Sequence, residues 1–140
     1  EVGIMDKGLI THLLADSNVT AITNRIHLGK ADHSDALPRI SLIRDDARGH
    51  GHSTAHAGLT EAFFSAYCYD SRPGAAETLA ETVRKSVDGK GGTSMGSVNV
   101  RSIFATVTQG DQVPAQAGEE RGAAFYIVDI EATYVSTVPA

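Results

Sequence analysis

One stretch of the sequence, residues 59–89, restricts the fold more than any other because it predicts a strand followed directly by a helix. Residues 59–69 are rich in aromatic and small apolar side chains, as strands are. Ser71 is the expected N-cap of the helix, and Pro73 falls in its first turn, where a missing N–H costs nothing. Within 72–88, apolar residues recur at helical spacing, and Gly89 is a natural stop. This stretch predicts an amphipathic helix that lies on a sheet.

The rest of the chain predicts a second helix and three more strands. An N-terminal helix is expected over residues 2–15, and the stretch 16–18 ends it and can cap a short second turn over 19–22. Strands are expected at 37–44, 97–108 and 123–135, separated by long polar loops at 45–58 and 109–121 and a glycine-rich turn at 90–96. We therefore predict a single α+β domain over 1–140. Its sheet is four-stranded and mainly antiparallel, and the amphipathic helix packs on one face of it. The N-terminal helix is the domain's other helix.

The predicted strand 59–69 is apolar on both of its faces. Phe64 and Cys68 point to one side together with small residues, whereas Phe63, Tyr67 and Tyr69 point to the other. The helix at 72–88 can cover only one of these sides. Either the N-terminal helix or a second subunit must cover the other, and the sequence leaves both interpretations open.

Composition excludes several classes of protein. A net charge of −5 argues against a general nucleic-acid binder, and the single Cys68 rules out an internal disulfide. Cys68 lies within the strand pattern and is interpreted as a small buried hydrophobic residue. We see no signal peptide and no apolar run of membrane-spanning length, and the first residue, Glu1, suggests a trimmed start.

His50, His52 and His56 are the only set of side chains that resembles a metal site. Two histidines separated by a single residue, with a third nearby, can bind zinc and leave a coordination position open for water. The alternative hypothesis is therefore a small metal-binding or zinc-hydrolase domain. These histidines lie in a Gly/Ser-rich loop without an evident second-shell carboxylate, so a solvated loop is favoured. We predict no enzymatic activity, no catalytic residues, no metal and no cofactor.

The layout of the chain resembles the tail-completion, or tail-terminator, proteins of long-tailed bacteriophages and gene-transfer particles. The resemblance spans about residues 9–136. It rests on the stretches 13–22 and 25–26, 36–42 with the strand entry Leu37–Pro38, 63–70 leading into 75–88, 98–103, and 123–134. The loop at 48–56 departs from the family's pattern.

The resemblance implies a structural virion protein at the head–tail joint, assembled in the host cytoplasm. Such proteins form a ring, usually hexameric, that caps the tail tube, ends its elongation and joins it to head-completion, or stopper, proteins. Genomic DNA would pass through the lumen without sequence-specific binding, and no membrane is involved. We expect the oligomer and partner interface to include aromatic residues of the two-faced strand and residues of the long loops: Arg48, His50, His52, His56, Phe63, Tyr67, Tyr69, Gln112, Glu119, Glu120 and Arg121.

Overall fold

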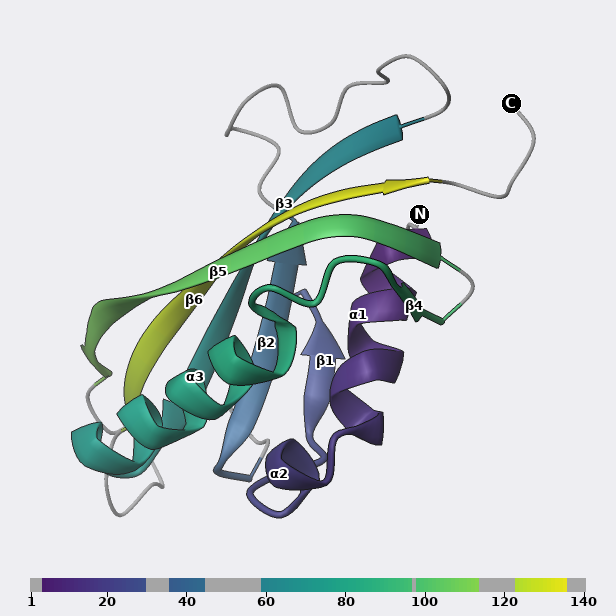
Figure 1. Cartoon of the computed structure of the whole chain (residues 1–140). Helices are drawn as coiled ribbons and strands as arrows, with labels where there is room; N and C mark the ends of the chain where they lie inside the picture. The colour runs from purple at the N-terminus through teal and green to yellow at the C-terminus, as the bar shows by residue number, and fades with distance from the viewer. Residues whose placement is uncertain (1–3, 30–35, 45–58, 97, 114–122, 136–140) are drawn as a thin grey trace.

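The computed structural model describes residues 4–29, 36–44, 59–96, 98–113 and 123–135, which form a layer of helices on a curled six-stranded sheet (Figure 1). The helices are α1 (Ile4–Ala15), α2 (Ser17–Thr20) and α3 (Pro73–Val87). The strands are β1 (Ile26–Leu28), β2 (Arg39–Arg44), β3 (Leu59–Asp70), β4 (Thr93–Met95), β5 (Val98–Val113) and β6 (Ala123–Val135). Their order is β1-β2-β3-β6-β5-β4; β1 and β2 are parallel, and all other neighbours are antiparallel.

β3, the strand predicted at 59–69, lies at the centre of the sheet beside β6. It pairs with β2 along one edge and with β6 along the other. Phe64 and Cys68 are fully buried beneath the helices, together with Ala62 and Ala66. The alternation predicted for this strand is confirmed, and with it the α+β class and the mainly antiparallel sheet.

α3 contacts β3, β5 and β6, and its buried Ala76 and Ala80 carry only methyl side chains that permit close packing. The prediction of Ser71 as its N-cap is wrong by one residue. Arg72 takes that position without a side-chain cap bond, because Pro73 is already the first helical residue. The Ser71 N–H instead donates to the Asp70 carboxylate at 2.7 Å. None of the described helices combines the length and apolar content that crossing a membrane requires.

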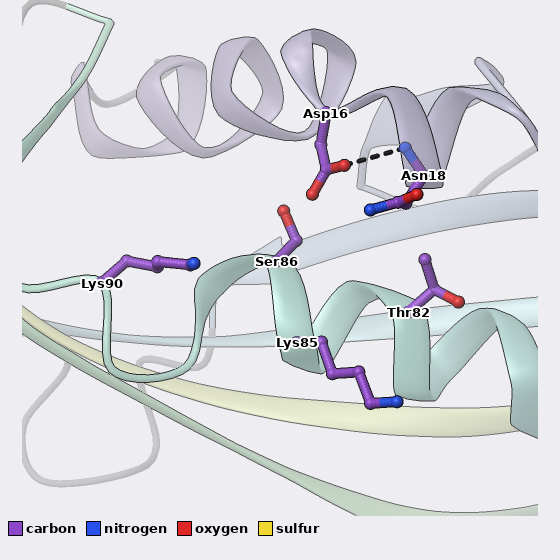
Figure 2. Close-up of a pocket in the computed structure, with 6 residues that line it drawn as sticks. All are labelled: Asp16, Asn18, Thr82, Lys85, Ser86 and Lys90. Carbon is purple, nitrogen blue, oxygen red and sulfur yellow. Dashed lines mark hydrogen bonds between the residues drawn. The ribbon is translucent and has the colours of Figure 1, made fainter.

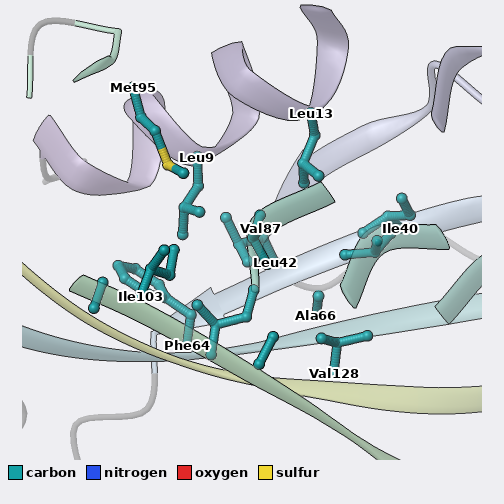
Figure 3. Packing of buried hydrophobic residues seen from close by; sticks show 14 of the residues in the cluster. Leu9, Leu13, Ile40, Leu42, Phe64, Ala66, Val87, Met95, Ile103 and Val128 are labelled. Carbon is teal, nitrogen blue, oxygen red and sulfur yellow. The ribbon is translucent and has the colours of Figure 1, made fainter. Parts of the chain in front are cut away.

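α1 lies on the same side of the sheet as α3 (Figure 1). Leu9 and Leu13 from α1 enter the core that contains Phe64 and Val87, as Figure 3 shows. The Asp6 carboxylate also accepts a 3.0 Å ion-pair contact from Arg44 at the end of β2. The interpretation that the N-terminal helix covers the second face of β3 is therefore wrong.

The sheet has six strands rather than the predicted four, because two short edge strands were not recognised. The predicted strands do not include β1, and β4 lies inside the segment predicted to be a glycine-rich turn. Gly92 and Gly96 adopt positive φ on either side of β4, so each end of this three-residue strand can turn sharply. β5 also continues to Val113, well into the segment predicted as a loop.

The structure makes a direct prediction for Cys68, the free thiol buried in β3. Burial raises the pKa of this thiol, which keeps the reactive thiolate form scarce. We expect an aromatic disulfide reagent to label native protein at least about a hundredfold more slowly than denatured protein, since labelling requires opening of the core. Equal labelling rates in buffer and in denaturant would show that β3 is not buried as described.

Candidate functional site

The side of the sheet that faces away from α1 and α3 is here called the open face. No helix of the described residues lies on it (Figure 1). The strand register aligns its side chains in rows that run across the sheet. Four successive rows are Phe63, Glu131 and Phe104; then Ile43, Ser65, Asp129 and Thr106; then Ser41, Tyr67, Ile127 and Thr108; and then Arg39, Tyr69 and Phe125.

Aromatic side chains gather at one end of the open face. The Phe125 ring lies 5.8 Å from the Tyr67 ring and 5.4 Å from the Tyr69 ring, measured between centroids. The Arg39 guanidinium carbon lies 4.6 Å from the centre of the Tyr69 ring, within cation–π range. Gly110 permits this arrangement, because any Cβ there would collide with the Phe125 ring. Burial raises the pKa of Tyr69, and the nearby Arg39 opposes that shift.

The middle of the open face is polar. Asp129 accepts hydrogen bonds from the hydroxyls of Ser65 and Thr108, each at 3.3 Å. These two hydrogen bonds hold the Asp129 carboxylate against the sheet. Glu61 and Glu131, by contrast, have exposed side chains on the same face.

Two phenylalanines flank Glu131 in the first row of the open face. Phe63 on β3 is half-buried, and Phe104 on β5 is 58% exposed, the highest exposed fraction among the large apolar side chains of the described residues. Ile127 on β6 is also only half-buried. The face therefore combines incompletely buried apolar side chains with carboxylates, which is a composition suited to contact with another protein surface.

A polar pocket lies on the opposite side of the molecule, between α2 and the C-terminal end of α3 (Figure 2). Its volume is about 440 Å³, and its lining residues are Asp16, Asn18, Thr82, Lys85, Ser86 and Lys90. The Asp16 carboxylate accepts a 2.9 Å bond from the Asn18 N–H, so within the predicted capping stretch 16–18 it is Asp16 that caps α2. The proximity of the Ser86 hydroxyl, and then this N–H and His12, lowers the pKa of Asp16, while burial opposes the shift.

Ser86 itself is 4% exposed, and its hydroxyl finds no partner at hydrogen-bonding geometry within the described part of the chain. It faces the Asp16 carboxylate in Figure 2. The Ser86 carbonyl is bonded to the His12 ring at 2.8 Å, which fixes the end of α3 against α1. The pocket is therefore lined by a helix end that is held in place, and it contains a buried hydroxyl without a hydrogen-bond partner.

The structure places three of the predicted interface residues on one surface. Phe63, Tyr67 and Tyr69 all lie on the open face, and none of them is fully buried. Gln112 belongs to β5, where its backbone pairs with Ala124. The remaining predicted residues lie outside the described residues: Arg48, His50, His52, His56, Glu119, Glu120 and Arg121. Their roles in an interface stay predictions.

The zinc hypothesis concerns histidines at 50, 52 and 56, which lie outside the described residues. Within the ranges that are described, no three His, Cys, Asp or Glu side chains are grouped closely enough to hold a metal ion.

Sequence reasoning missed several residues of the open face, above all Phe104, Phe125 and Ile127. Phe125 and Ile127 alternate with the buried residues of β6, so the period of two could have identified them. Phe104 was harder to assign. The irregularity between Val100 and Ser102 reverses the alternation within β5, so that Val100 and Ile103 both face the core.

Comparisons with known proteins agree with this architecture. The family model described as tail completion protein gp17 matches residues 7–116 of the chain. A solved chain from the "Virion of native gene transfer agent (GTA) particle" superimposes with a TM-score of 0.63 at 13% sequence identity. That match covers 91% of this chain and 92% of the other, and it shows a shared fold. No curated protein sequence matches.

Proposed function

We propose that this chain, which belongs to the gp17 family of tail completion proteins, assembles into a hexameric ring that caps the tail tube. Family membership makes it a structural protein of the virion tail. The ring, its partners and its work at the head–tail joint are the proposal.

The open face is the observation that carries the proposal of self-association. It presents aromatic and aliphatic side chains on several adjacent strands, and α1 and α3 both pack on the opposite side. Burying such a surface against another copy removes apolar area from water at about 25 cal/mol per Å², although association costs offset much of this gain. A closed ring would use the surface without leaving an open-ended contact.

In this role the protein blocks further growth of the tube sterically and catalyses no reaction. One side of the ring matches the end of the tube and offers no surface on which further tube subunits can add. The other side receives the head-completion, or stopper, protein. DNA passes through the lumen and is not read, in keeping with the net charge of −5, which disfavours tight binding to phosphates. We propose no catalytic step and no cofactor.

Sedimentation of the purified chain, alone and with tail tubes, tests this function. We expect a discrete hexamer, either free in solution or formed on tube ends, and electron microscopy should show a ring at one end of each tube. Tubes assembled in the presence of the protein should also stop growing. A chain that stays monomeric and leaves tube length unchanged would contradict the proposal.

A further inference from the structure

The pocket between α2 and α3 has the chemistry of a carboxylate receptor. Lys85 and Lys90 line it, and neither forms an ion pair among the residues that the structure describes. The Ser86 hydroxyl is buried there without a bonded partner. The native carboxylate of the pocket, Asp16, is already bonded to the Asn18 N–H. Two lysines on its wall and an unbonded buried hydroxyl therefore suit the binding of one further anionic group.

Glu61 and Glu131 are the exposed carboxylates of the open face, and Glu131 is the one that the register sets between two phenylalanines. Its side chain is exposed, whereas Asp129 in the next row is held by two hydroxyls. The register sets Glu131 between Phe63 and Phe104. Apolar rings around a charge exclude water from the contact and so strengthen its attraction to a cation.

The two features lie on opposite layers of the domain, Glu131 on the sheet and the pocket on the helices (Figures 1 and 2). A ring with head-to-tail contacts needs two different, complementary surfaces on every copy. We infer that Glu131 of one copy inserts into the Lys85–Lys90 pocket of the next copy, with Phe63 and Phe104 packing around the contact. This inference rests on the proposed function, since it assigns the two surfaces that meet within the ring.

A charge swap tests the pairing directly. Glu131→Lys alone, and Lys85→Glu with Lys90→Glu, should each weaken self-association at least tenfold, because each places like charges in contact. Combining all three substitutions restores opposite charges and should recover most of the assembly. Sedimentation velocity at low and high salt measures both effects, and the wild-type contact should weaken as salt screens it.

Matched controls separate this contact from general charge effects and from misfolding. Glu77→Lys on α3 and Lys7→Glu on α1 alter exposed charges away from both surfaces and should leave assembly unchanged. Circular dichroism melts should show that every variant folds, since the substituted side chains that change assembly are exposed.

Each outcome decides the inference. Rescue by the combined variant supports it. Variants that assemble like the wild type, or a combined variant that does not recover, overturn it while the wild-type ring still supports the proposed function. A third outcome also overturns it: Glu131→Lys assembles fully, whereas the double variant Lys85→Glu with Lys90→Glu no longer caps tubes. The pocket would then receive an acidic group of the tube protein. A wild-type chain that forms no oligomer at all contradicts both proposals.

Discussion

Replacing Phe64 by alanine is expected to lower the free energy of unfolding by about 3–5 kcal/mol. Phe64 is fully buried in β3 and is among the largest side chains of the core, where α1, α3 and the sheet meet (Figure 3). Truncation would leave a cavity that surrounding side chains cannot fill. Since small domains are stable by only about 5–15 kcal/mol, this loss is a large share of the total. Urea denaturation followed by circular dichroism measures it.

The neighbouring Phe63 supplies a matched control of the same residue type on the same strand. It points to the open face and is half-buried, so Phe63→Ala should cost only about 1 kcal/mol of stability. If the open face joins two copies, this variant should instead lose self-association at concentrations where the wild type assembles. Equal destabilisation by the two substitutions, with assembly intact in both, would contradict the assignment of the two faces.

Replacing Gly8 by alanine is expected to destabilise the protein by about 1–3 kcal/mol, although glycine-to-alanine changes inside helices usually stabilise. The reason is the close approach of α1 to β4. A Cβ at Gly8 would collide with the Met95 carbonyl oxygen, which is backbone and cannot rotate away. The helix would have to move outward and expose part of the core formed by Leu9 and Met95. Thermal unfolding measures the change.

Gly74→Ala in α3 is the control for this prediction, because a Cβ there meets nothing within 4 Å. It should stabilise the protein by about 0.4–1 kcal/mol by reducing the freedom of the unfolded chain. If Gly8→Ala lowers the stability of the protein and Gly74→Ala raises it, Gly8 is required for the contact between α1 and β4. A stabilising Gly8→Ala would show that α1 does not pack on β4 as the structure has it.

The central part of the fold could be predicted because its signals are local. The alternation of β3 and the apolar stripe of α3 each follow from neighbouring residues and agree with the structure. Helix propensity is also local, and by propensity alone Gly8 would only weaken its helix. Its actual role depends on Met95, a residue distant in the chain.

The edges of the sheet could not be predicted for a related reason. β1 and β4 are three residues long and show no alternation of their own, so only pairing with β2 and β5 defines them. The candidate site was predicted in part, through Phe63, Tyr67 and Tyr69. Its remaining residues come from β5 and β6, and their alignment with β3 depends on register and on the irregularities in β5, which sequence periodicity does not reveal.

An electron cryomicroscopy map of the assembled particle, resolved to side chains, would show whether another copy of this chain covers the open face. We expect Phe63, Phe104 and Glu131 of each copy to lie against the helical layer of its neighbour, with Glu131 beside Lys85 and Lys90. A ring in which these side chains face solvent or the lumen, and the contacts between copies lie elsewhere, would contradict it.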